Sequence, residues 1–405
     1  MTTDSTAPPR STTSGRCPFD HHAVQTAEEV WASYADLREE RVSRSELHGG
    51  FYVLSRYTDV RTALRDPRTF SSAAGVRIPD SGGRSIPIDF DPPAHTGYRA
   101  LYASRLTAAS VQAMAPFLSE LVNGLVDAFH RAGGGDFVSG VALPMPLAVL
   151  EEVVGFSPTT ISQLRRLTEE SWRQITEHSL DEARAALRQV IRAEIARHRS
   201  ERPDTYLTTL LDASIEGRPI TDDELERALL TFAIAGHETT TNAAGWLAHL
   251  LASDQGQQAA LRQDPSLIPG FVEEILRVGT PAQLFARQTT RDVEVGDTVI
   301  PAGSRVLLAL AAANRDDAQF PHADVIDLER GSRGHLAFGF GIHQCPGSLL
   351  ARTELRLLLA RLIELPALVP AGPADFGGLV GGIHHGPRSL PLAFADAPTG
   401  AGGDR

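Results

Sequence analysis

The chain has 405 residues, of which 42% are hydrophobic and 22% charged, so it can bury a large core. Its formal net charge is -12 and it has no run of lysine or arginine, which argues against nucleic acid or an anionic membrane as a partner. It has no apolar run of about 18 residues, and its first residues lack the basic and apolar blocks of a signal peptide. We therefore expect a cytoplasmic protein with no membrane anchor. An acidic protein could still dock on a local basic patch.

The chain contains two cysteines, Cys17 and Cys345, which lie far apart in unlike surroundings. Such a pair does not form a disulfide framework and is typical of a reducing compartment. A thiolate in that compartment is free to bind a metal.

The two ends of the chain differ in composition from the rest. Residues 1–26 are rich in proline, serine and threonine and residues 396–405 in glycine, which predicts unpacked tails around one domain of residues 27–395. Apolar residues three and four apart predict helices over 27–42, 107–131, 159–199, 222–252, 268–278 and 347–363. Strand-forming runs between turn residues predict strands at 51–54, 293–295, 298–300 and 306–308. The predicted fold class is mainly α with small β-sheets.

A further short helix is predicted after the prolines at 92 and 93. His95 and Arg99 are four residues apart and would project from the same face of this helix. Paired cationic donors suit a ligand that carries carboxylates. The alternative is two ordinary surface cations.

The long apolar helix from about residue 225 to 251 contains poor helix formers in its middle, Gly236 and the threonines 239–241. The glycine costs about 1 kcal/mol and each threonine some tenths relative to alanine, so something other than helix stability placed them there. Glu238 and Thr239 put a carboxyl group and a hydroxyl group side by side at this defect, where they could hold a water chain. The alternative is a local kink in which threonine hydroxyls bond back to carbonyl groups.

Glu274 and Arg277 are three residues apart on one face of the helix at 268–278. Such a pair by itself usually forms a solvated ion pair worth some tenths of a kcal/mol. We assign it to folding and not to chemistry.

The segment from Phe338 to Gly347 is a glycine-rich loop that leads directly into the last predicted helix. Its glycines allow the backbone to bend tightly beneath a flat ligand. Cys345 precedes the N-terminus of the helix, whose dipole favours the thiolate. The alternative is a small buried hydrophobic residue in a tight turn.

The pattern Phe-x-x-Gly-x-x-x-Cys-x-Gly in this loop resembles the haem-binding loop of the cytochrome P450 family, and the resemblance covers about residues 27–395. It implies a single-domain cytochrome P450 fold with heme b (iron protoporphyrin IX) as cofactor and Cys345 as the proximal thiolate ligand of the iron. It also implies the other residues of the haem site. These are His95, Arg99, Arg287 and His343 on the haem propionates, Phe338 and Gly347 in the cysteine loop, and Gly236, which leaves room for dioxygen.

The resemblance also implies roles for two pairs of residues that each contain a glutamate. Glu238 and Thr239 would deliver protons to dioxygen, whereas Glu274 and Arg277 would hold the core on the haem side. The substrate pocket would be formed by the loop from about 73 to 90, the long helix and two later segments. Its expected lining is Ile86, Ile88, Phe232, Ala235, Leu284, Phe285, Leu379 and Val380.

The implied function is a monooxygenase that inserts one atom of O2 into a small organic substrate, by C–H hydroxylation or a related oxidation, in specialised metabolism or catabolism. Electrons would come from a ferredoxin and an NAD(P)H-dependent ferredoxin reductase. Two alternatives stay open, an oxidative-coupling or peroxide-driven haem-thiolate enzyme and a non-catalytic haem sensor. Glu238 and Thr239 favour the monooxygenase, because proton delivery serves dioxygen.

The chain departs from the family pattern at two positions. Many relatives carry an arginine that bonds the Glu-x-x-Arg pair where this chain has Val325, so the third member of that cluster is open. Pro346 follows the ligand directly and has no N–H to donate to the sulfur.

Overall fold

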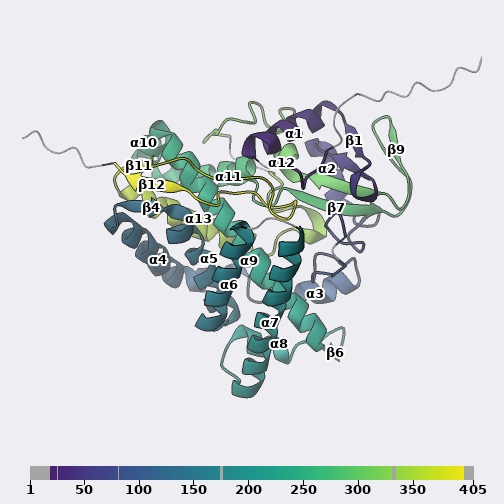
Figure 1. Ribbon diagram of the computed structural model, residues 1–405, viewed down its shortest axis with the longest axis horizontal. Helices are drawn as coiled ribbons and strands as arrows, with labels where there is room; N and C mark the ends of the chain where they lie inside the picture. The colour runs from purple at the N-terminus through teal and green to yellow at the C-terminus, as the bar shows by residue number, and fades with distance from the viewer. Residues whose placement is uncertain (1–18, 25, 81, 174–176, 331–333, 396–405) are drawn as a thin grey trace, which may run out of the picture.

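A computed structural model of the protein describes residues 19–24, 26–80, 82–173, 177–330 and 334–395. Most of these residues are helical, and the strands form two small sheets and two hairpins (Figure 1). The predicted fold class, mainly α with small β-sheets, is confirmed. Among the described helices, none is long and apolar enough to span a membrane.

The helices alternate between long core elements and short connecting ones. They are α1 Ala27–Glu39, α2 Tyr57–Arg65, α3 Ala94–Ala103, α4 Ala108–Arg131, α5 Pro144–Val154, α6 Pro158–Arg173, α7 Glu177–Glu201, α8 Tyr206–Leu211, α9 Asp222–Ser253, α10 Gln255–Gln263, α11 Ile268–Gly279, α12 Leu310–Asn314 and α13 Ser348–Glu364. The larger sheet has the order β1 Val42–Ser45, β2 Phe51–Leu54, β10 Arg305–Ala309, β7 Leu284–Thr289 and β3 Phe70–Ser71. The smaller sheet has the order β11 Leu368–Pro370, β12 Pro391–Phe394 and β4 Gly134–Asp136, and the hairpins pair β5 Ser214–Ile215 with β6 Arg218–Pro219 and β8 Val293–Val295 with β9 Thr298–Ile300.

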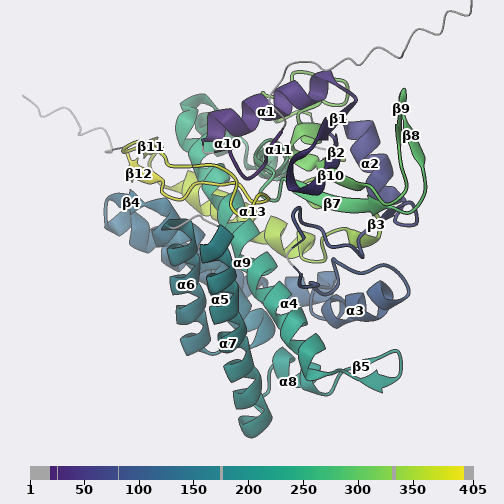
Figure 2. The same cartoon turned by 45° about the vertical axis from the view of Figure 1, so that its right-hand side comes forward.

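Helix α9 has 32 residues and is therefore about 48 Å long at 1.5 Å per residue. A capping box fixes its start, because the Thr221 hydroxyl accepts from the N–H of Glu224 and the Glu224 carboxylate accepts from the N–H of Thr221. Its first half packs in one hydrophobic cluster through Leu229 and its second half in another through Leu247. Helices α5 and α7 pack against it (Figure 2), so α9 connects the two helical cores.

Strand β10 lies in the middle of the larger sheet, parallel to β2 and antiparallel to β7. Alternate side chains of a strand point to opposite faces of a sheet. Leu308 therefore packs in one hydrophobic cluster, whereas Leu307 packs in another. The same alternation on β7 puts Phe285 and Arg287 on the first face and Leu284 on the second.

The predicted helices agree with the structure except in one region. The single helix expected over 159–199 is two helices, α6 and α7, and residues 174–176 between them lie outside the described part of the chain. The short helices α2, α5, α8, α10 and α12 and the strands β1, β3–β7, β11 and β12 were not predicted, because segments this short carry few repeats of a periodic pattern. All the predicted strands are present.

The N-terminal tail expected over residues 1–26 is partly wrong. Phe19 and Val24 pack against the hydrophobic cluster that contains Val30 and Leu307, and the ring of His21 is buried. Packed structure therefore begins no later than Phe19. Residues 1–18, with Cys17, and residues 396–405 lie outside the described residues.

Candidate active site

The segment from Phe338 to Gly347, here called the cysteine loop, joins the sheet region to α13. The N–H of Cys345 donates to the carbonyl oxygen of Phe338 at 2.8 Å, which closes the loop on itself. Gly341 has φ of +73°, and a Cβ there would lie 2.5 Å from the Leu64 carbonyl oxygen of α2. Only glycine fits this left-handed and crowded position, so the loop conformation depends on the motif residues themselves.

Cys345 is a free and partly exposed cysteine three residues before α13. Burial raises the pKa of its thiol, while the N–H of Gly347 and the positive charges of Arg99 and Arg352 act in the opposite direction. The N–H at the helix N-terminus therefore favours the thiolate as predicted, but burial opposes it and is the larger effect. A coordinated metal cation deprotonates a thiol outright, so this cysteine is suited to become a thiolate when it binds a metal.

Four basic side chains from three elements gather beside the cysteine loop. The rings of His95, on α3, and His343 lie 4.5 Å apart, and Arg99 donates to the carbonyl oxygen of Gln344 at 2.6 Å. Burial lowers the pKa of His343 to about 3, and the positive charges of Arg287, His95 and Arg99 act in the same direction. The predicted set of His95, Arg99, Arg287 and His343 is thus brought together in space.

This basic cluster has the chemistry of a carboxylate site. The Nε2 atom of His95 is buried and has no hydrogen-bond partner among the described residues. Arg287 is 4% exposed, and burial lowers its pKa to about 10 although Asp89 and Asp91 act in the opposite direction. Buried cations and an unpaired ring nitrogen are costly without an anionic partner. The residues therefore fit a ligand that carries carboxylate groups, as heme b does.

The middle of α9 is regular, so the predicted helix defect is wrong. Helix α9 continues without a break through 236–241, and the hydroxyl of Thr239 donates to the carbonyl oxygen of Ala235 at 2.8 Å. Ala235 is exposed although it lies in the middle of a core helix. A Cβ at Gly236 would lie 2.8 Å from Cδ2 of Leu150 on α5. The glycine therefore permits close packing of α5, and the room for dioxygen beside it stays a prediction.

Glu238 has a partner that the sequence did not reveal. Its Oε2 atom lies 3.2 Å from Nδ1 of His384, which belongs to a loop held by bridges to Ala282 and Val380. Burial alone would raise the pKa of Glu238, but the charge and hydrogen bond of His384, aided by His237 and Arg77, outweigh it and lower the pKa to about 2. No spacing rule relates His384 to α9, so only the fold could identify this ion pair.

The pair Glu274 and Arg277 is fully buried and bidentate, with N···O distances of 2.7 and 2.8 Å. It is therefore not a solvated pair. Position 325, where many relatives carry an arginine, is Val325 here. Arg330 takes the place of that arginine, because its Nε lies 3.3 Å from Oε2 of Glu274. Arg277 and Arg330 both donate to the carbonyl oxygen of Val325, so this position contributes its backbone to the cluster.

The expected pocket residues do not all have the same surroundings. Ile86 and Leu284 are 0% exposed and belong to hydrophobic clusters, so neither lines an open space and both predictions are corrected. The alternation of β7 turns Leu284 away from the face of Arg287. The other six have at least some exposed surface and stay predictions; they are Ile88, Phe232, Ala235, Phe285, Leu379 and Val380.

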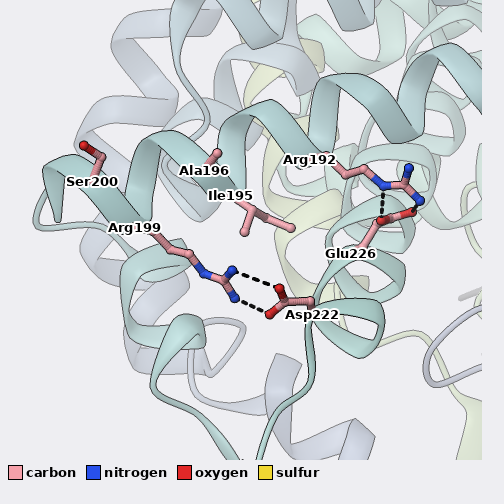
Figure 3. Close-up of a pocket in the computed structure, with 7 residues that line it drawn as sticks. All are labelled: Arg192, Ile195, Ala196, Arg199, Ser200, Asp222 and Glu226. Carbon is pink, nitrogen blue, oxygen red and sulfur yellow. Dashed lines mark hydrogen bonds and ion pairs between the residues drawn. The ribbon is translucent and has the colours of Figure 1, made fainter.

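A hollow of about 560 Å³ lies elsewhere, between α7 and the first turns of α9 (Figure 3). Its arginines are paired, Arg192 with Glu226 and Arg199 with Asp222. Glu226 is about 18 Å from Glu238 along α9, at 1.5 Å per residue. This hollow is therefore separate from the residues predicted to act in the active site.

Comparisons with known proteins agree on one family. The sequence model of cytochrome P450 matches residues 159–365. Cytochrome P450 107B1 of Saccharopolyspora erythraea is 35% identical over 385 residues, which cover 89% of this chain and 93% of the relative. The steroid C26-monooxygenase of Mycobacterium tuberculosis is 33% identical over 365 residues, which cover 86% of this chain and 96% of the relative. The structure of the LnmA cytochrome P450 hydroxylase of Streptomyces atroolivaceus has a TM-score of 0.77 and 33% identity, over 89% of this chain and 96% of that one.

The chain therefore belongs to the cytochrome P450 family. Its cofactor is heme b, and it is a monooxygenase that acts on a small organic molecule with O2 and takes electrons from redox partners. The predicted family, cofactor and class of enzyme are confirmed.

Proposed function

We propose that this protein hydroxylates a C–H bond of a small, mostly apolar molecule, with Cys345 as the axial ligand of the iron. The observation that carries this assignment is the free cysteine in a self-closed loop beside four basic side chains. When bound, heme b supplies the activation of O2, and a thiolate ligand favours cleavage of the O–O bond. The substrate would lie near Ala235 and Thr239 on α9. Ala235 is exposed there, and Thr239 carries a hydroxyl group.

We assign the basic cluster to the two haem propionates. His95, Arg287 and His343 approach from α3, β7 and the cysteine loop, so the cofactor would be held by three separate elements. Arg99 would both pair with a propionate and fix Gln344, next to the ligand. Charge-assisted hydrogen bonds of this kind orient a carboxylate more strongly than neutral ones.

Proton supply would run through Glu238 and Thr239. The carboxylate of Glu238 is held by His384, and both side chains are partly exposed, at 14% for Glu238 and 10% for His384, so protons can reach the pair from solvent. The hydroxyl of Thr239 donates to Ala235 and keeps its lone pairs free to accept a hydrogen bond from water. His384 is a positioning residue in this scheme, because it acts through Glu238.

Replacing His384 with glutamine should move the low-pH limit of coupled turnover to higher pH. In the native protein Glu238 is ionised above a pKa of about 2. Without the hydrogen bond and charge that His384 supplies, burial acts with less opposition and the pKa of Glu238 rises, so protonation of Glu238 begins at a higher pH. The measurement is product formed per NAD(P)H as a function of pH.

Two further variants control the His384→Gln experiment. His384→Lys restores a positive charge and should bring the limit back toward that of the native protein. His249→Gln changes another histidine that packs against Trp246 near the end of α9 and should leave the profile unchanged. An identical profile in native protein and His384→Gln would contradict the positioning role.

Replacing Pro346 with leucine should raise the iron potential by tens of millivolts. The N–H of Gly347 bonds to the Cys345 sulfur, whereas Pro346 has no N–H to give. A restored N–H would withdraw charge from the thiolate, which is worth about 1 kcal/mol for one hydrogen bond. Redox titration measures the shift. Pro346→Gly should move the potential in the same direction, and a potential that stays or falls in both variants would leave proline only a role in stiffening the turn.

We propose a ferredoxin and an NAD(P)H-dependent ferredoxin reductase as electron donors, and a cytoplasmic location. Support comes from basic groups around the cysteine loop, where Arg61 lies 4.4 Å over the ring of Phe340, Arg65 is exposed and the side chain of Arg356 is 40% exposed. Such a surface suits an acidic partner although the chain as a whole is negative. Residues 27–395, with the packed segment from Phe19 to Val24, would form the single catalytic domain.

Reconstitution tests this function directly. Native protein with NADPH, a surrogate ferredoxin and its reductase should consume O2 and form an oxidised product, once a screen for the substrate-induced spectral shift has found a ligand. The relatives include a steroid C26-monooxygenase and a hydroxylase from the leinamycin biosynthetic pathway, so the screen should include compounds of catabolism and specialised metabolism. Turnover with peroxide alone would favour the peroxide-driven alternative, and a spectral shift with no turnover would favour a sensor.

A further inference from the structure

Three histidines from two segments meet on the side of the sheet next to α1. His21 and His22 precede α1, and His48 lies in the turn Leu47–Gly49 between β1 and β2. One ring nitrogen of each lies within 4.8 Å of the others, and the ring centroids are 4.3, 5.6 and 5.2 Å apart. We propose that His21, His22 and His48 form a binding site for a divalent transition-metal ion, with zinc as the preferred occupant.

The hydrogen bonds leave suitable lone pairs on two of these rings. Nε2 of His21 and Nε2 of His22 both lie 2.8 Å from the carbonyl oxygen of Ile78, which can accept two N–H groups. A neutral imidazole that donates through Nε2 has its lone pair on Nδ1. His21 is 2% exposed, and its Nδ1 has no hydrogen-bond partner among the described residues. A buried ring nitrogen without a partner is costly, and a metal ion would satisfy it.

Asp20 supports the other side of the cluster. Its Oδ1 atom lies 3.0 Å from Nε2 of His48 and accepts the backbone N–H of His22 at 2.9 Å. A carboxylate or carbonyl group that accepts from the second nitrogen of a histidine orients the ring and raises its basicity, which is the usual arrangement around metal-binding histidines. Here the Ile78 carbonyl oxygen is the partner of the His21 and His22 rings, and the Asp20 carboxylate is the partner of the His48 ring.

The charge state of the cluster also suits a cation. Burial lowers the pKa of His21 to about 4, with His22 and His48 acting in the same direction and Ile78 and Asp20 in the opposite one. His21 is therefore uncharged at neutral pH and can ligate. Tetrahedral zinc with bonds of about 2.0–2.1 Å places its nitrogens roughly 3.3 Å apart, so the rings would rotate to bring the ligand nitrogens, now within 4.8 Å of one another, to that spacing. Imidazole ligands favour zinc over magnesium or calcium, which prefer oxygen.

A metal at this point would connect separate parts of the chain. A Cβ at Gly382 would lie 2.7 Å from atoms of both His21 and His22, so these rings pack against the backbone of the loop that carries His384. The ion would fasten the segment before α1 to the turn between β1 and β2. Because the unfolded chain does not hold these ligands together, binding free energy would appear as stability of the folded protein.

Equilibrium dialysis of the haem-loaded protein tests the proposal. The protein is first stripped of metal ions with EDTA, then dialysed against ZnCl2, and zinc and iron are measured per chain. We expect one bound zinc that His22→Gln and His48→Asn each weaken at least tenfold, while CaCl2 and MgCl2 give no binding. Zinc should also raise the melting temperature of the native protein but not that of the variants.

The controls separate this site from other histidines and from the haem. His48 has φ of 52° and His322 has φ of 56°, so His322→Asn reproduces the backbone change at a position outside the cluster and should bind zinc like the native protein. The carbon monoxide spectrum of each variant should be unchanged, which verifies folding and an intact haem site. Native protein that binds no more zinc than the double variant of His22→Gln and His48→Asn would overturn the proposal, and so would equal affinity in all the variants.

Discussion

Replacing Cys345 with alanine should abolish the absorption band of thiolate-ligated haem that the reduced protein shows with carbon monoxide. The band requires a sulfur ligand on the iron, and Cys345 is the free cysteine of the described residues. The structure describes no second cysteine, so within the described residues no other thiolate can replace it. We expect complete loss of the band and of monooxygenase turnover.

The second cysteine provides the control for this experiment. Cys17→Ala should leave the band and the turnover unchanged. Circular dichroism of Cys345→Ala should retain the helical signal, because α9 and α13 are held by apolar packing that does not include the sulfur. Loss of the band in Cys17→Ala, with the band kept in Cys345→Ala, would refute the assigned ligand.

Replacing Thr239 with alanine should divert most reducing equivalents from product to peroxide. The Thr239 hydroxyl is next to the buried carboxylate of Glu238, and its removal takes a hydrogen-bonding group from the proposed proton route. Positioned proton transfer contributes about 10²–10⁴-fold to rates, so product per NAD(P)H should fall by about tenfold or more. Substrate affinity, measured by the spectral shift, should change little.

A neighbouring threonine tests whether this effect belongs to the hydroxyl at position 239. Thr241 is 1% exposed, and its hydroxyl has no hydrogen-bond partner among the described residues. Thr241→Ala alters helix propensity in the same way and should keep the native coupling. Equal coupling in native protein and Thr239→Ala would mean that the hydroxyl only bonds back to Ala235.

The cysteine loop could be predicted because most of its signals lie within one short segment, although the contact of Gly341 with Leu64 of α2 comes from the fold. Gly341 is required by a left-handed backbone and a close carbonyl, and Cys345 is fixed by a bond within the loop and by the helix that follows. Helix α9 was predictable for a similar reason, since a capping box and a long apolar pattern are local signals.

Contacts between distant segments could not be predicted in this way. Gly236 in the sequence suggests space for a small ligand, but in the fold a Cβ there would meet Leu150 of α5. Leu284 is apolar and near the expected pocket, yet the register of β7 with β10 turns it into the core. Both contacts concern the direction in which a position points, which is set by packing against another element.

The sequence by itself determined the family, the cofactor and most of the helices, and it supplied the proposed iron ligand, because each depends on residues close together in the chain. The tertiary structure decided which distant side chains complete the clusters. Arg330 joins Glu274, and His384 joins Glu238, at positions that no spacing rule connects. A buried charge without a partner is strongly destabilising, and the partner can come from any segment that the fold brings within a few ångströms.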